Sequence, residues 1–184
     1  MSDTPLYAQR KTGLFVGLTA LLVVLDQLSK WWVRENIALG SERVEVIPGL
    51  FELVHVENTG AAFGMLSGQS WAMWLFIPFT VIAGLVLVSM LRDLPDDVVL
   101  EPLVLGSIFG GAMGNFLDRV RVQGVTDFLR VYTEQPDIQA FLLKNLGSAE
   151  WPSFNVADIA IVVGVTCFVA IEIFGRGRHP QKEG

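Results

Sequence analysis

Four long apolar runs dominate the chain, at about 13–34, 71–91, 98–119 and 155–174. Each run is long enough to cross a hydrocarbon layer of ~30 Å as a helix, which takes about 20 residues. A soluble chain of 184 residues would not need four such runs to build one core. The pattern predicts an all-α membrane fold with four transmembrane helices. We expect a single polytopic membrane domain over residues 1–184.

Between the first two runs, the apolar positions change to a period of two. Residues 40–57 alternate polar and β-branched side chains on both sides of a Pro48-Gly49 turn, within a β-rich loop that extends to about residue 66. Such alternation around a turn predicts a small β-sheet, which we expect at the extracytoplasmic membrane surface. The longest stretch outside the runs is the loop 120–153.

Composition supports the membrane class and excludes others. The chain is 52% hydrophobic and 17% charged, against roughly 25% charged residues in soluble domains. A scattered net charge of −6 does not favour a nucleic-acid partner. The lone cysteine, Cys167, excludes a disulfide framework. The first run carries Asp26 and lacks a small-residue cleavage site, so we expect a retained helix rather than a signal peptide.

Polar residues gather at one end of the predicted helices. In a four-span chain, the ends of runs one and three share a membrane side with the starts of runs two and four. The residues on that side are Asp26, Lys30, Asn58, Asn115, Asp118, Arg119, Asp127, Asn155 and Asp158, with Trp31, Trp32, Trp71, Trp74 and Trp151 as an interfacial aromatic belt. This clustering predicts one polar site at one leaflet.

The distribution of basic residues orients the chain. The opposite side has short segments that carry Arg10, Lys11, Arg92, Arg176, Arg178 and Lys182. A high density of Lys and Arg in short loops indicates the cytoplasmic side. We therefore expect both termini in the cytoplasm and the polar site near the outer leaflet.

Asp127 and Asp158 are the candidate catalytic pair. We place Asp127 in the loop beyond the third run and Asp158 in the first turns of the fourth, after a possible Ser153 cap. If the two carboxyl groups meet, repulsion and desolvation leave a shared proton, and the pair can act as acid and base. The alternative is two interfacial acids that only keep the loop ends solvated. Spacing alone does not decide between these readings.

The other polar residues have supporting roles in this interpretation. Asp26 and Lys30, four residues apart, share a helix face and can form an ion pair, unless Lys30 extends to the headgroups. Asp118 and Arg119 are expected to clamp the end of the third helix. Asn58 offers both a donor and an acceptor, and either contacts a substrate peptide or stabilises its own turn.

Other catalytic classes fit the sequence poorly. The two histidines, His55 and His179, belong to no His-Glu-x-x-His metal motif. Ser29 and Lys30 are adjacent, so a helix points them in different directions. No glycine-rich loop with a phosphate-binding lysine is present.

Five motifs in order resemble the bacterial lipoprotein signal peptidase family (signal peptidase II). They are Asp26-Gln-Leu-Ser-Lys30, Glu57-Asn-Thr-Gly-Ala-Ala-Phe63, Gly114-Asn-Phe-Leu-Asp-Arg119, Val125-Thr-Asp-Phe128 and Phe154-Asn-Val-Ala-Asp158. The resemblance implies that Asp127 and Asp158 are the catalytic aspartates of an aspartic endopeptidase. It implies site-supporting or substrate-binding roles for Asn58, Gly60, Asn115, Arg119 and Asn155, and structural roles for Asp26, Lys30 and Asp118.

The resemblance also implies a reaction, a substrate and a location. The family removes the signal peptide of a prolipoprotein on the N-terminal side of a diacylglyceryl-modified cysteine, at the bacterial inner membrane. No cofactor and no metal are implied; the partners are the lipidated precursor and membrane lipid, and we expect a monomer. The stretch 129–151 is longer than the family pattern, with an extra amphipathic element around 137–146.

Two functions from other classes remain as alternatives. A small proton- or ion-coupled transporter would carry its acids near the midplane and reach both sides in turn. A lipid-binding assembly factor would bind a lipidated precursor without needing either aspartate.

Overall fold

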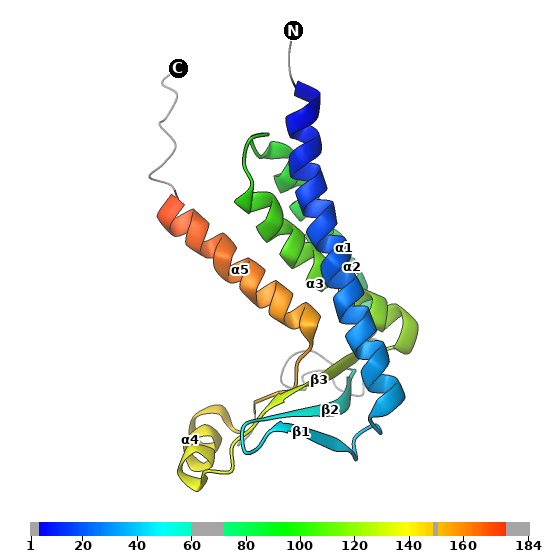
Figure 1. Ribbon diagram of the computed structural model, residues 1–184, viewed down its shortest axis with the longest axis vertical. Coiled ribbons are helices and arrows are strands. Elements are labelled where there is room, and N and C mark those ends of the chain that lie inside the picture. The colour runs from blue at the N-terminus through cyan, green and yellow to red at the C-terminus, as the bar shows by residue number, and fades with distance from the viewer. Residues whose placement is uncertain (1–3, 60–71, 149–150, 176–184) are drawn as a thin grey trace.

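A computed structural model describes residues 4–59, 72–148 and 151–175 of the chain (Figure 1). The elements, in order, are α1 (Thr4–Asn36), β1 (Arg43–Ile47), β2 (Phe51–Asn58), α2 (Ala72–Asp93), α3 (Leu100–Val122), β3 (Val125–Val131), α4 (Pro136–Leu146) and α5 (Val156–Gly175). The four long helices form a bundle whose one end carries the sheet and α4, while α1 begins and α5 ends at the other (Figure 1).

The four predicted spans correspond to four helices that are long and apolar enough to cross a membrane. The spanning segments are Arg10–Asn36, Phe76–Asp93, Leu100–Val122 and Val156–Phe174. Large apolar side chains on their outer faces are exposed, among them Leu85 and Phe174 at 67% and 80%. Exposure of this size suits contact with lipid rather than water. The predicted fold class is confirmed.

Helix α3 is the centre of the bundle and packs against α1, α2 and α5. Glycines permit these close approaches, since a Cβ at Gly106 would lie 2.8 Å from the backbone oxygen of Phe15. A Cβ at Gly114 would lie 2.5 Å from Oδ2 of Asp26. Such small-residue faces let membrane helices meet backbone to backbone, and they bring the polar residues of α1 and α3 together.

A three-stranded antiparallel sheet, in the order β1-β2-β3, lies against the end of the bundle. The predicted alternation at 40–57 gives β1 and β2, with Gly49 at φ 71° in the turn between them. Strand β3 was not predicted, and the expectation that Asp127 lies in a loop is wrong. Most of β3 is buried on both faces, so its side chains do not alternate between apolar and polar.

Helix α4 corresponds to the amphipathic element expected around 137–146. It begins at Pro136 and ends at Leu146, and the following Gly147 caps it with a φ of 73°. Its side chains Ile138, Phe141 and Leu143 are exposed.

Candidate active site

The chain segments that carry the two aspartates are joined by backbone hydrogen bonds. Phe154 N donates to Leu129 O over 3.0 Å, and Leu129 N donates to Phe154 O over 2.8 Å. This isolated antiparallel bridge sets the residues just before α5 beside β3. Although 31 positions separate Asp127 from Asp158 in the sequence, the bridge brings their segments to one place.

Asp127 is held from both sides by amide groups. It is buried on β3, opposite Val56 of β2. Its Oδ2 accepts a hydrogen bond of 3.1 Å from Asn58 Nδ2, and its Oδ1 accepts one of 2.8 Å from Asn155 Nδ2. Asn58 at the end of β2 and Asn155 just before α5 therefore fix the orientation of this carboxyl group.

Asp158 lies in the first turn of α5 and shares a reciprocal cap with Asn155. Asn155 Oδ1 accepts from Asp158 N over 3.0 Å, while Asp158 Oδ2 accepts from Asn155 N over 3.1 Å. This arrangement is a capping box, which satisfies two backbone donors at the helix start. The expected Ser153 cap is wrong, because Asn155 directly precedes the helix. Asp158 Oδ1 accepts a further bond of 2.8 Å from Asn115 Nδ2.

Asn155 thus contacts both carboxyl groups, and its side chain is fully buried. Burial, helped by the nearby negative charge of Asp158, raises the pKa of Asp127 to about 6. A carboxyl group with a pKa near 6 can exchange a proton near neutral pH. The two aspartates form one electrostatically coupled pair.

Lys30 forms a second polar centre behind this pair, inside the bundle. Its Nζ lies 2.9 Å from Asp26 Oδ2 and 3.1 Å from Asp118 Oδ2, and it donates to Asn115 Oδ1 over 2.9 Å. All three ammonium hydrogens therefore have acceptors. Lys30 is 0% exposed, which excludes the alternative in which its side chain extends to the headgroups.

Asp118 ties α3 to α1 and β3. It pairs with Lys30, lies 3.6 Å from Arg34 NH1, and accepts a hydrogen bond of 3.0 Å from the backbone N of Thr126. The expected clamp between Asp118 and Arg119 is wrong, because consecutive helical residues point in different directions. By holding Thr126, Asp118 fixes the residue next to Asp127.

Arg119 lies elsewhere on α3. Its guanidinium carbon lies 4.5 Å from the centroid of the Phe76 ring, and NH1 donates to Asn115 O over 3.3 Å. A cation over an aromatic face is a favourable contact, and here it joins the start of the second span to α3. Gly60, the remaining predicted site residue, lies outside the described residues, as does Trp71.

Sequence reasoning missed three contributors to the network. Gln27 Nε2 donates to Asp118 Oδ1 over 3.0 Å, and Arg34 NH1 donates to Thr126 Oγ1 over 2.9 Å. Arg34 follows Asp26 and Lys30 at the same four-residue spacing, so helical periodicity contains the signal for it. Thr126 had no such signal, because its role depends on the unpredicted strand β3.

Within residues 4–59, 72–148 and 151–175, no group of three or more His, Cys, Asp or Glu side chains could hold a metal ion. The donors around the aspartates are three side-chain amides and the backbone N of Asn155, which orient the carboxyl groups by hydrogen bonding.

The chain is similar to known proteins over most of its length. The family model described as "Signal peptidase (SPase) II" matches residues 18–174. A lipoprotein signal peptidase of Nitratidesulfovibrio vulgaris (strain DP4) is 38% identical over 174 residues, covering 94% of this chain and 95% of the relative. One of Geobacter metallireducens is 36% identical over 170 residues, covering 92% and 96%.

Solved structures agree with the sequence matches. A bacterial membrane enzyme determined by the in meso method at 2.3 Å resolution superposes with a TM-score of 0.74 at 27% identity, covering 94% of both chains. A second, at 1.9 Å resolution, gives a TM-score of 0.70 at 28% identity, covering 88% of this chain and 94% of the other.

Proposed function

The chain belongs to the signal peptidase II family and is a membrane protease that removes signal peptides from lipoproteins, and we propose that it does so as an aspartic endopeptidase. Asp127 and Asp158 are the catalytic residues in this proposal. The scissile bond lies on the N-terminal side of a diacylglyceryl-modified cysteine in the precursor.

The proposed reaction uses one water molecule and one shared proton. The ionised carboxylate takes a proton from water as the oxygen attacks the scissile carbonyl carbon, and the protonated carboxyl group donates to the carbonyl oxygen. Collapse of the tetrahedral intermediate then breaks the C–N bond: one carboxyl group donates a proton to the leaving amino group of the lipidated cysteine, and the other takes a proton from a hydroxyl of the intermediate, which restores the shared proton. Because the aspartates titrate as a pair, neither is assigned the acid or the base role alone.

One observation carries the proposal: buried Asn155 bonds both carboxyl groups at once. An acid/base pair requires two carboxyl groups held close in a low-dielectric site, so that repulsion keeps one of them protonated. The direction of the Asp127 pKa supports this arrangement. Two acids that only solvate loop ends would need neither a buried aspartate nor one asparagine that donates to both of them.

The supporting residues fall into two groups. Asn58, Asn115 and Asn155 orient the carboxyl groups through the hydrogen bonds described above, and we assign Gly60 and Arg119 to the substrate side of the site. Asp26, Lys30 and Asp118 have a structural role, since they bond one another inside the bundle rather than the aspartate pair. The proposed chemistry needs no cofactor and no metal.

The proposed location is the bacterial inner membrane, with both termini cytoplasmic and the site near the outer leaflet. The sheet lies at one end of the bundle, and α1 begins at the other (Figure 1); Lys11, near the start of α1, bonds the backbone of Arg92 in the last turn of α2. A precursor with its lipid in the outer leaflet and its signal helix in the bilayer would present its scissile bond at the sheet. Lipid and the lipidated precursor are the partners, and the enzyme acts as a monomer.

The transporter alternative is less well supported, because Asp127 and Asp158 lie at one end of the helices rather than near their midpoint. Incubation of the purified protein with a diacylglyceryl-cysteine precursor tests all the alternatives. We expect a shortened product that begins at the lipidated cysteine, and none from the precursor without lipid. A precursor that is bound but never shortened would contradict the proposal and favour an assembly factor.

A further inference from the structure

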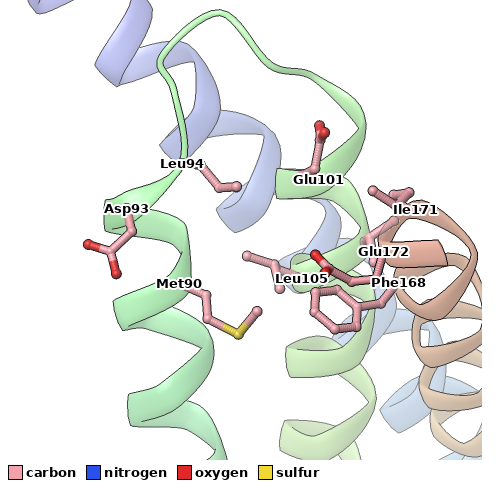
Figure 2. A pocket seen from close by; sticks show the side chains of 9 residues that line it. Met90, Asp93, Leu94, Glu101, Leu105, Phe168, Ile171 and Glu172 are labelled. Atoms are coloured by element: carbon pink, nitrogen blue, oxygen red, sulfur yellow. The ribbon is translucent and has the colours of Figure 1, made fainter. Parts of the chain in front are cut away.

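Helix α4 stands apart from the packed helices of the bundle. Inside the bundle, apolar side chains cover one another, as where Leu105 of α3 packs against Met90 of α2 and Phe168 of α5 (Figure 2). Across the residues that the structure describes, α4 has no extensive packing against any other helix or strand. A helix of 11 residues is only marginally stable in water when nothing packs on it. Its stability therefore calls for a further contact.

One side of α4 is apolar and exposed. Ile138, Phe141 and Leu142 follow one another at helical spacing, and Leu143 widens the side that they form. Phe141 is 64% exposed, and Ile138 and Leu143 are exposed as well. Large apolar side chains that gather on one side of a helix are expected to be covered by an apolar partner.

The polar side chains of α4 do not oppose such a contact. Gln139 and Asn145 lie among the apolar side chains, but their amide groups are engaged within the chain. Gln139 Nε2 donates to Thr133 O over 2.7 Å, and Asn145 Nδ2 donates to Phe141 O over 2.7 Å. A polar group that already has a hydrogen bond costs less to remove from water. The charged Lys144 lies on the opposite side of the helix.

The position of α4 identifies the partner. Figure 1 shows α4 at the end of the bundle that carries the sheet. At this end, Trp31 and Trp32 near the end of α1 and Trp151 just before α5 are exposed, and exposed tryptophans are typical of the membrane–water interface. Trp151 follows the end of α4 by five positions, and five residues of chain span at most about 17 Å. The chain therefore keeps α4 close to the interface.

An exposed apolar surface adjoins α4 on the sheet. Tyr132, four residues before α4, donates its backbone N to Leu50 O over 3.0 Å, and Leu50 and Ile47 at the turn between β1 and β2 are exposed. A second protein fits this region less well than lipid does. The side of an 11-residue helix is only about 16 Å long, whereas a stable protein–protein interface buries roughly 800 Å² per partner.

We propose that α4 is an interfacial helix, which inserts its apolar side into the headgroup and upper acyl region of the bilayer that the bundle spans. Helices of this kind lie in the plane of the interface, with their apolar side buried about 5–10 Å into it. The inference goes beyond the proposed function, since it depends on the membrane-spanning helices and not on the aspartate pair. Because α4 lies between β3 and the bridge residue Phe154, its contact with lipid holds the loop between Asp127 and Asp158 at the membrane surface.

The first test measures where each side of α4 lies in a bilayer. The full chain, with Cys167→Ser to remove its lone cysteine, receives either Ile138→Cys or Ala140→Cys, and the new thiol is labelled with a small fluorophore. The two positions are two residues apart and point in different directions on α4, so Ala140 is the matched control. Each protein is placed, one copy per nanodisc, in phosphatidylcholine of which a fraction carries a nitroxide near the top of its acyl chain.

We expect the lipid nitroxide to quench the label at position 138 at least about twofold more strongly than the label at position 140. Aqueous iodide should quench the two labels in the opposite order. Strong and equal quenching of both labels by iodide would place α4 in water and overturn the inference. A label at position 138 that is shielded from both quenchers would show that protein covers this side of α4, which would overturn the inference as well.

The second test needs no label. Amide hydrogen exchange in α4 is measured in nanodiscs without nitroxide for the wild type, for Ile138→Ser combined with Phe141→Ser, and for the control Lys144→Gln. Serine is close to isoleucine and phenylalanine in helix propensity, as glutamine is to lysine, so the comparison isolates the apolar contact. We expect exchange to accelerate at least about threefold in the serine variant and to stay unchanged in Lys144→Gln. Equal exchange in all three proteins would contradict the contact with lipid.

Discussion

Asn155 donates a hydrogen bond of 2.8 Å from its side-chain amide to Oδ1 of Asp127. Through its backbone N and its Oδ1, the same residue also completes a capping box with Asp158. One buried asparagine therefore starts α5, orients one aspartate and connects it to the other. Helix initiation and the geometry of the candidate active site depend on the same side chain.

Substitution of Asn155 separates these two tasks. Asn155→Ser retains an N-cap oxygen but loses the amide that bonds Asp127, whereas Asn155→Ala loses both. We expect the alanine variant to be less stable than the serine variant by about 1 kcal/mol, and both variants to lose most of their cleavage activity. Thermal unfolding in detergent and cleavage rates measure the two effects. A serine variant with full activity would show that the bond to Asp127 is dispensable.

The raised pKa of Asp127 predicts a specific pH dependence of stability. Because its pKa rises from 3.8 to about 6 on folding, the folded protein keeps a proton between pH 4 and 6 that the unfolded chain has released. The contribution of Asp127 to the free energy of unfolding is therefore highest below pH 4. It falls as pH rises through 6, by a total on the order of 3 kcal/mol.

Asp127→Asn should remove this dependence. We expect the stability of the variant relative to the wild type to increase as pH rises from 4 to 7, in thermal unfolding measured at each pH. Asp137→Asn, a change at an exposed position of α4, is the control and should follow the wild-type curve. Parallel curves for the wild type and Asp127→Asn would contradict a raised pKa in the folded state.

Asp118→Asn should lower stability together with activity. The substitution removes a buried negative charge that pairs with Lys30 and accepts from Thr126 N. Removing one partner of a buried ion pair lowers the free energy of unfolding by about 3–5 kcal/mol. Because Asp26 still pairs with Lys30 in this variant, we expect a loss at the lower end of that range. Denaturation in detergent measures the loss. An inactive Asp118→Asn variant with unchanged stability would overturn the structural role.

The close packing of α3 against α5 gives a prediction with an internal control. A Cβ at Gly111 would collide with the backbone oxygen of Ala157, whereas a Cβ at Gly17 would have nothing within 4 Å. We expect Gly111→Ala to destabilise the protein by about 1–3 kcal/mol and to lower activity, because Ala157 follows Asn155 closely. Gly17→Ala should be neutral or slightly stabilising. Equal thermal stability of the two variants would contradict this packing.

Much of the fold could be predicted from the sequence because the membrane imposes long apolar runs. The four spans and the alternation at 40–57 needed only periodicity and length. Strand β3 was not predicted, because both of its faces are buried. Its apolar residues Val125, Phe128 and Leu129 therefore do not alternate with polar side chains. Its presence depends on long-range pairing with β2, which no local pattern contains.

The sequence predicted which residues belong to the candidate site, but not which of them form hydrogen bonds or ion pairs with one another. Topology alone placed Asp127 and Asp158 on one side of the membrane. Which residues bond them depends on the bridge between Leu129 and Phe154, and on the direction of each side chain on α3. The expected pair of Asp118 with Arg119 failed for that reason, since Asp118 points to Lys30.

The central claim is that Asp127 and Asp158 together catalyse cleavage of a lipidated precursor. The most direct measurement compares the cleavage rates of the wild type, Asp127→Asn and Asp158→Asn on one diacylglyceryl-cysteine precursor, after each variant is shown to be folded. Asparagine has nearly the same shape as aspartate but cannot exchange the proton, so we predict rates at least about 10²-fold lower for both variants. Full processing of the precursor by either folded variant would contradict the account.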